Sequence, residues 1–229
     1  MVLRVLDVET TGTDPAADRI VEIAAVDLDQ NGKIASMMQN LCNPQRTIPP
    51  QASAVHHIID ADVATAPPFS EIAHKYDGAD IYIAHNAAFD RGFVEPTLGA
   101  KTWICTMKCA LRIWPDAPGF SNQTLRYWRG HVTPFDHPRE SVKPHGALSD
   151  AIVTGALFFD LLKAAEFSDL KRWSAEPALY TTFAFGKHRG QRFDAVDQSY
   201  LRWIVDKSDL DADTKFSARH WLNKAKETA

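Results

Sequence analysis

The chain has 229 residues, of which 45% are hydrophobic and 24% are charged, and its formal net charge is −4. These shares are those of an average globular protein, so composition excludes a fibrous or a disordered chain. The net charge argues against nonspecific coating of nucleic acid by the whole surface, but it leaves room for a local basic groove.

No apolar run approaches the roughly 20 residues that cross a bilayer, so we expect no membrane partner. Arg4 and Asp7 interrupt the apolar stretch that a signal peptide needs, which indicates a cytoplasmic protein. The cysteines Cys42, Cys105 and Cys109 are odd in number, and the close pair is spaced by three residues, not two. Neither a disulfide framework nor a zinc knuckle is therefore expected.

The first predicted element is a buried strand that carries two carboxylates. Residues 2–8 are mostly apolar, and Asp7 and Glu9 project from the same face because residues two apart in a strand share a face. Neighbouring carboxylates repel each other and resist desolvation, and divalent cations compensate them well. On this stretch alone, the alternative that Asp7 caps a turn while Glu9 faces solvent is equally favoured.

An antiparallel meander is predicted next. The stretch from Arg19 to Leu28 is rich in β-branched residues, Asn31-Gly32 is a hairpin signal, and Ile34 to Leu41 forms a third strand. Short helical patterns follow at Ser53 to Ile59 and at Ser70 to Tyr76.

The pattern then changes to alternating strands and helices. Strands are predicted at Ile81 to Ala84 and around Trp103 to Cys105, and helices at Thr106 to Trp114, Asn122 to Trp128 and Ala147 to Ala165. Asn86 is predicted to cap a further helix that begins near Phe89 and Asp90. The alternation indicates an α/β fold in which a mixed sheet is flanked by helices.

The pattern weakens at residues 166–179, which indicates a linker between a main domain of residues 1–165 and a small C-terminal domain of residues 180–229. In that domain Thr181 to Phe185 is strand-like, and Ser199 to Val205 and Asp211 to Lys224 are helical, so an α+β region is expected. About 50 residues make a marginal domain alone. We therefore expect this region to lean on the main body.

Acidic residues lie next to the predicted elements at three places in the main domain. The motifs are Asp7-x-Glu9-Thr10-Thr11-Gly12, His85-Asn86-x-x-Phe89-Asp90 and His145-x4-Asp150. Their order and spacing closely resemble the three motifs of the DEDDh family of 3′→5′ exonucleases, over residues 1 to about 165. The resemblance implies a ribonuclease-H-like fold.

The resemblance also implies that Asp7, Glu9, Asp90 and Asp150 bind two divalent metal ions, with His145 as the general base. Phosphodiester hydrolysis builds charge on the entering and leaving oxygens, which two metals roughly 3.5–4 Å apart neutralise. Oxygen ligands without cysteine favour Mg²⁺ or Mn²⁺ over Zn²⁺.

His145 is expected in the loop before the last helix of the main domain. Five residues of helix would turn His145 away from Asp150, whereas Pro144 and Gly146 favour a loop from which the ring can reach the metals. A histidine that titrates near neutral pH suits proton transfer from water. The alternative is a surface histidine in a polar loop.

Further positions match family residues near the substrate. Those that line the pocket for the terminal nucleotide are Thr10, Thr11, Gly12, Asn86 and Phe89, and His56 matches a histidine near the substrate. Phe89 is equally typical of a core residue, and His56 is equally typical of a hydrogen-bonded structural histidine.

The C-terminal region carries a basic turn between glycines. The stretch from Phe185 to Phe193, with Tyr200 to Trp203, resembles the corresponding region of exodeoxyribonuclease X-type proteins. Its cations Lys187, Arg189 and Arg192 suit contact with DNA phosphates, because the glycines let the backbone approach. The alternative is a solvated hairpin tip.

These observations predict a metal-dependent 3′→5′ exodeoxyribonuclease that releases nucleoside 5′-monophosphates in DNA repair or end processing. Its partner would be the 3′ end of DNA, single-stranded or frayed, and a polymerase or repair partner stays unidentified. One alternative is an exoribonuclease of the same family. Another is a non-catalytic module that binds nucleic acid or a polymerase, although all five predicted catalytic residues are present.

Overall fold

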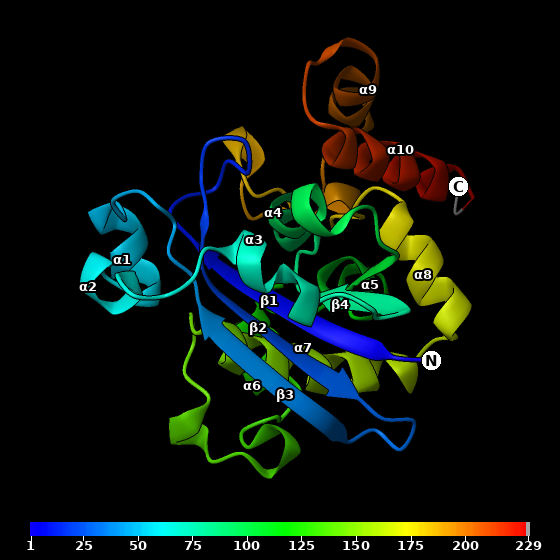
Figure 1. The fold of residues 1–229 in the computed structure, drawn as a ribbon. Coiled ribbons are helices and arrows are strands. Elements are labelled where there is room, and N and C mark those ends of the chain that lie inside the picture. The colour runs from blue at the N-terminus through cyan, green and yellow to red at the C-terminus, as the bar shows by residue number, and fades with distance from the viewer. Residues whose placement is uncertain (228–229) are drawn as a thin grey trace.

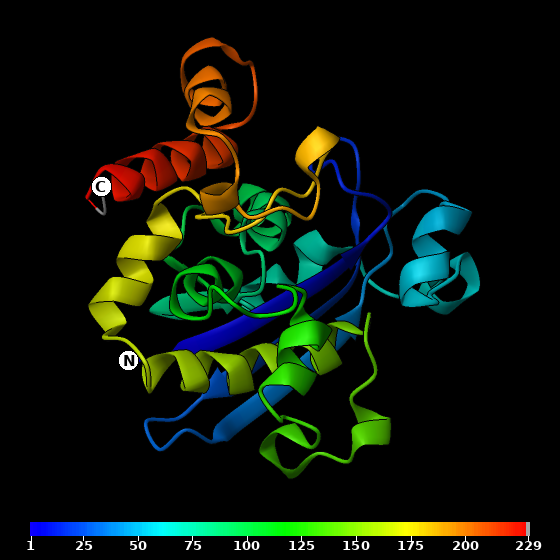
Figure 2. The same ribbon diagram turned by 180° about the vertical axis from the view of Figure 1, so that it is seen from behind.

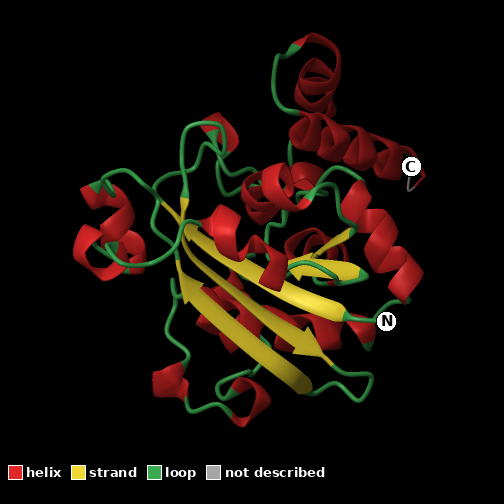
Figure 3. Ribbon diagram, viewed as in Figure 1, coloured by secondary structure: helices red, strands yellow, loops and turns green. Residues whose placement is uncertain are grey.

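Strand β1 (Leu3–Thr10) lies at the centre of a mixed sheet in the computed structural model, which describes residues 1–227 (Figure 1). Within these residues the sheet has five strands in the order β3-β2-β1-β4-β5. On one side, β2 (Ile20–Leu28) and β3 (Ile34–Leu41) are antiparallel neighbours; on the other, β4 (Ile81–Ala84) and β5 (Trp103–Cys105) continue the sheet in parallel. The predicted meander and mixed sheet are confirmed (Figure 3).

The side chains of β1 alternate between two apolar cores. Leu3 and Val5 pack in the core that includes helix α7 (Ala147–Leu162), which runs across one face of the sheet (Figure 2). The opposite core includes Leu6 and helix α4 (Ala88–Leu98). Because every second residue shares a face, the acids at positions 7 and 9 extend the row that packs on α7. The pleat of β1 thereby selects the helix that these acids meet.

Shorter helices complete the main body. They are α1 (Pro50–His56), α2 (Asp60–Val63), α3 (Phe69–Ile72), α5 (Thr106–Ile113), α6 (Asn122–Trp128) and the 3-10 helices η1 (Ala73–Lys75), η2 (Pro134–Asp136) and η3 (Arg139–Ser141). The helix predicted at Ser53 to Ile59 starts three residues earlier, because Pro50 suits the first helical turn, and it ends where His57 adopts a left-handed φ of 63°.

The segment predicted as a linker, residues 166–179, instead contains helix α8 (Phe167–Ala175). Leu170 is fully buried, and the Ser174 hydroxyl accepts a hydrogen bond from the Cys105 backbone amide (2.8 Å). The helix therefore covers the outer edge of β5, which would otherwise present unpaired backbone groups. The expectation of a linker is wrong because this contact joins positions 69 residues apart, and no local pattern signals it.

The C-terminal region consists of the 3-10 helices η4 (Gly186–His188) and η5 (Phe193–Ala195) and the helices α9 (Gln198–Lys207) and α10 (Ala212–Glu227). The strand expected at Thr181 to Phe185 is reduced to an isolated antiparallel bridge between Thr182 and Arg192. The region has its own apolar cluster and leans on the main body, as expected. An ion pair between Arg192 and Asp116 (3.0 Å) joins the two parts. Among the described residues, no helix is both long and apolar enough to span a bilayer.

Candidate active site

The carboxylates of Asp7, Glu9 and Asp150 meet at the end of β1. One oxygen from each lies within 4.8 Å of the other two. Asp7 and Glu9 come from adjacent same-face positions of β1, and Asp150 comes from the first turn of α7, which packs on that face. The structure therefore brings together three of the four acids that the motifs predict to bind metal.

Asp90 approaches from the first turn of α4 and is only 2% exposed. Its Oδ1 accepts a hydrogen bond from the backbone amide of Val8 (3.2 Å), the residue between Asp7 and Glu9. Among the described residues, Asp90 does not belong to the 4.8 Å cluster. It lies close enough for its charge to raise the pKa of Asp7.

Asn86 does not cap α4, so this prediction is wrong. Ala87 occupies the cap position without a side-chain hydrogen bond, and Asn86 has a left-handed φ of 66°. Asparagine tolerates this conformation better than most residues. Its role here is to let the chain turn sharply from β4 into the helix that carries Asp90.

His145 lies in the loop before α7, as Pro144 and Gly146 predict. Its side chain is exposed, its φ is 61°, and its backbone amide donates a hydrogen bond to Asp150 Oδ2 (2.9 Å). This hydrogen bond therefore fixes the loop relative to Asp150 of α7, while the exposed ring remains accessible to a substrate.

The electrostatics of the acidic cluster are unfavourable to negative charge. Burial and then the neighbouring acids raise the pKa of Asp7 well above its usual value, and the same causes raise that of Glu9 to about 8. Burial raises the pKa of Asp90 to about 7 and also raises the pKa of Asp150. A cation between these carboxylates would offset the cost of burying their negative charges close together.

Two residues that hold the site in place were not predicted from the sequence. Glu22, opposite Glu9 in β2, accepts a hydrogen bond from the Ala147 amide at the start of α7 (2.8 Å). Gln123 of α6 donates from Nε2 to Asp150 Oδ1 (2.7 Å). Glu22 was detectable as an acid that interrupts the apolar start of β2, whereas nothing near Gln123 in the sequence points to its role.

The turn after β1 is built around Asp18. The Thr11 hydroxyl donates to Asp18 Oδ1 (2.9 Å), and a side chain at Gly12 would collide with the same carboxylate. Thr10 is buried, and its hydroxyl donates to the Gly12 carbonyl. These contacts give the end of β1 a rigid backbone next to the acids.

The two predicted aromatic substrate positions differ in their surroundings. Phe89 is half-buried, and its ring centroid lies 5.1 Å from that of Phe93, so it belongs partly to the core. His56 is buried, and its Nδ1 accepts a hydrogen bond from the Ile58 amide (3.0 Å). Its Nε2 must then carry the proton. Burial lowers the pKa of His56, and a hydrogen bond to the Thr10 backbone at the end of β1 partly offsets that effect, although within the described chain Nε2 has no partner at full hydrogen-bond geometry.

His85 is structural. Its Nε2 donates to the Phe120 carbonyl (2.8 Å), its Nδ1 contacts the Thr106 hydroxyl (2.9 Å), and burial lowers its pKa to about 4. It is therefore neutral near pH 7 and joins β4 to α5 and to the loop before α6.

The three predicted tail contacts are not equivalent. Arg192 is held by Asp116 and Asp194, both at 3.0 Å, and so serves the domain contact. The Lys187 Nζ lies 4.8 Å from the centroid of the Tyr200 ring. The exposed Arg189 side chain has no protein partner within residues 1–227.

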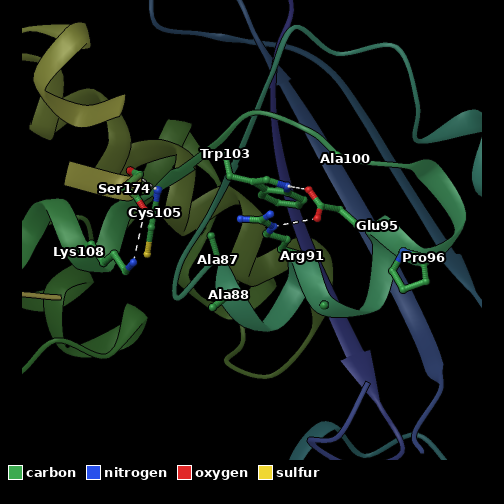
Figure 4. A pocket seen from close by; sticks show the side chains of 11 residues that line it. Ala87, Ala88, Arg91, Glu95, Pro96, Ala100, Trp103, Cys105, Lys108 and Ser174 are labelled. Carbon is green, nitrogen blue, oxygen red and sulfur yellow. Dashed lines mark hydrogen bonds and ion pairs between the residues drawn. The ribbon is translucent and has the colours of Figure 1, made fainter. Parts of the chain in front are cut away.

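A cavity of about 660 Å³ lies beside α4, and none of the four predicted metal-binding acids lines it (Figure 4). Arg91 and Trp103 both point to Glu95 in this cavity, with bonds of 2.8 and 3.0 Å. The Lys108 ammonium at its other end donates to the Glu176 carbonyl (2.6 Å). The polar groups of the cavity are thus engaged within the protein, and no predicted site residue lines it.

Comparison with known families decides what these motifs represent. Residues 5–158 match the family described as Exonuclease, and this range contains all five predicted catalytic positions. The chain belongs to the exonuclease family. The predicted relationship is confirmed, and the exonuclease carries its acids on the elements where the three motifs place them.

This exonuclease is 36% identical over 230 residues to Exodeoxyribonuclease 10 of Escherichia coli (strain K12), with 96% of this chain and 99% of that protein covered. A solved structure titled Exonuclease X in complex with 5′ overhanging duplex DNA matches with a TM-score of 0.62 at 36% identity. This match covers 76% of the present chain and 99% of the chain in that structure. E. coli Exonuclease I in complex with a dA16 oligonucleotide matches with a TM-score of 0.58 at 16% identity, over 75% of this chain and 42% of its own. The predicted ribonuclease-H-like fold is confirmed.

Proposed function

We propose that this exonuclease removes nucleotides one at a time from the 3′ end of DNA and releases nucleoside 5′-monophosphates. The observation that carries the proposal is the cluster of Asp7, Glu9 and Asp150 oxygens within 4.8 Å at the end of β1. The names of Exodeoxyribonuclease 10 and of the Exonuclease X complex refer to DNA, which favours DNA over RNA as the substrate.

The acidic cluster fits divalent metal ions. Its carboxylates are partly buried and raise one another's pKa, so a cation would relieve their repulsion. Asp7, Glu9, Asp90 and Asp150 would hold two Mg²⁺ or Mn²⁺ ions, because these metals prefer oxygen ligands. When bound, the ions stabilise the charge that develops on the phosphate and on the entering and leaving oxygens.

His145 would accept the proton of the attacking water. Its ring is exposed and makes no hydrogen bond within residues 1–227, and its backbone amide bonds Asp150, so it stands at the edge of the acidic cluster. Imidazole ordinarily titrates near neutral pH, which suits a general base.

The terminal nucleotide would lie against the end of β1 and the start of α4. Thr10, Thr11 and Gly12 offer a rigid backbone, and Asn86 and Phe89 border the opposite side. The His56 Nε2 proton faces the Thr10 backbone but makes no well-formed hydrogen bond among the described residues, so it would donate to an acceptor on the nucleotide. Such a pocket accepts a chain end and not a continuous strand.

We place this activity in cytoplasmic DNA repair or end processing. Cys42, Cys105 and Cys109 are buried free thiols, which suits a reducing compartment.

The proposal is tested by incubating the protein with three end-labelled substrates of the same sequence and sizing the products. The substrates are single-stranded DNA, 5′-overhanging duplex DNA and RNA, each with Mg²⁺ or Mn²⁺. We expect mononucleotide release from the 3′ end of DNA, an intact closed circular single strand, and no product from the Asp7→Asn variant. Faster turnover of RNA would identify an exoribonuclease. Binding without turnover by folded, metal-loaded protein would identify a non-catalytic module.

A further inference from the structure

An aromatic pair on α9 faces solvent in the C-terminal region. Trp203 is 45% exposed, and its ring stacks on that of Tyr200, with centroids 5.6 Å apart and planes at 20°. Trp221 of the same region is only 6% exposed. A large ring left in water beside a second ring offers a flat apolar surface without a partner in the described chain.

This pair rests on a rigid base. The Tyr200 ring contacts the His188 ring (4.4 Å) and the Phe183 ring (6.0 Å). Phe183 is 2% exposed and stacks on Phe193 at 3.8 Å in the core of the region. The exposed rings are therefore held in place before any ligand arrives, which lowers the entropic cost of binding.

One cation contacts the rings, and others lie near them in the sequence. The Lys187 ammonium lies 4.8 Å from the centroid of the Tyr200 ring, and Lys207 lies one helical turn beyond Trp203. Arg189 and Arg202 are also exposed, and each lies close in the sequence to Lys187 or Trp203. Asp206, on the same exposed part of α9, is a nearby acid.

Of the other neighbouring acids, Asp209 is exposed like Asp206, whereas two are engaged in the structure. Asp194 pairs with Arg192 at 3.0 Å, and Asp197 caps α9 through the Ser199 amide (2.7 Å). Exposed aromatic rings beside cations are the kind of surface that binds single-stranded nucleic acid, since bases stack on the rings and phosphates meet the cations. The exposed cations near the rings, Lys187, Arg189, Arg202 and Lys207, outnumber the exposed acids Asp206 and Asp209, so this surface favours a polyanion over an uncharged partner.

We propose that Lys187, Tyr200, Trp203 and Lys207, here called the stacking face, hold the single-stranded part of the substrate on its way to the active site. The inference rests on the proposed function. Figures 1 and 2 show η4, which carries Lys187, on the side of the molecule where β1 ends, with α9 farther out. The ion pair between Arg192 and Asp116 joins the region to the main body, so the face keeps its place.

Binding of fluorescent oligonucleotides by the full chain tests the proposal. The Asp7→Asn background prevents degradation, and the probes are dT30 and dT4. Trp203→Ala should weaken dT30 binding about tenfold or more, since stacking of one base contributes this much. Binding of dT4, the probe for the active site alone, should change less than twofold. Trp128→Ala, which removes another exposed tryptophan (43%), is the matched control and should leave both affinities unchanged.

Two further readouts separate stacking from a structural effect. Trp203→Phe should restore most of the dT30 affinity. Lys187→Gln with Lys207→Gln should lower the slope of log K against log salt by about 0.7 for each lost phosphate contact. Equal dT30 affinity in Trp203→Ala and the parent overturns the stacking face, and so does an equal loss for dT4. Because these measurements use the silenced chain, their failure is independent of whether the intact enzyme cleaves DNA.

Discussion

The backbone amide of His145 and the carboxylate of Asp150 are joined by a hydrogen bond of 2.9 Å. The bond uses the main chain of His145, so the ring takes no part in holding the loop against α7. Positioning of this residue and its chemistry are therefore separable by mutation.

His145→Asn should abolish proton transfer while keeping the loop. Asparagine tolerates the left-handed φ of 61° at this position, and the amide that bonds Asp150 is retained. We expect kcat to fall about 10²–10⁴-fold and the lower limb of the pH–rate profile to move, with unchanged half-saturation by Mn²⁺. An unchanged pH–rate profile would make His145 a surface histidine.

Asp7→Asn should act in opposite directions on activity and on metal-free stability. Turnover should fall by several orders of magnitude, because a charge that holds the metals is lost. At pH 8 in EDTA the melting temperature should rise by a few degrees, because a buried acid repelled by Asp90 and Asp150 is removed. Near-normal cleavage by the folded variant would contradict the metal-binding role.

The metal-free protein should lose stability as the pH rises from about 4.5 to about 8. The pKa of Glu9 is raised from 4.5 to about 8, and that of Asp90 from 3.8 to about 7, so in this window the folded state holds protons that the unfolded chain has released. Stability then falls with increasing pH. Melting temperatures measured in EDTA from pH 5 to 8.5 should decline, and Mn²⁺ should reduce the decline. A melting temperature that rises with pH in EDTA would show that the acids are not mutually repelled.

Gln123→Met should weaken metal binding without removing a ligand. The variant keeps the length of the side chain but loses the bond to Asp150 Oδ1. Loss of such a supporting contact raises the metal concentration for half-maximal activity about 10–100-fold. Gln51→Met, at an exposed position of α1, is the matched control and should behave as the parent. If both variants need the same metal concentration for half-maximal activity, Gln123 does not support metal binding, and its role is the hydrogen bond that it accepts from Arg126.

Local patterns in the sequence were sufficient for the family, the sheet and the predicted acids. The period of two in β1 puts Asp7 and Glu9 on one face, and the glycine and proline around His145 place it in a loop before α7. Helix α6 has the predicted bounds, Asn122–Trp128. The face of the acids in β1, the loop at His145 and the bounds of α6 depend on residues within a few positions of one another, and the family depends on the order and spacing of the three motifs, so the sequence by itself determined them.

Tertiary structure decided how the acids are supported and where the chain is covered. Glu22 bonds the Ala147 amide across 125 residues, and Gln123 bonds Asp150 across 27. Ser174 likewise reaches the edge of β5 and turns an expected linker into a packed helix. Each contact needs the partner's position in space, which neither hydrophobic period nor turn chemistry encodes. The motifs therefore identify the acids, whereas the contacts that hold the acids in place appear only once α6, α7 and α8 pack on the sheet.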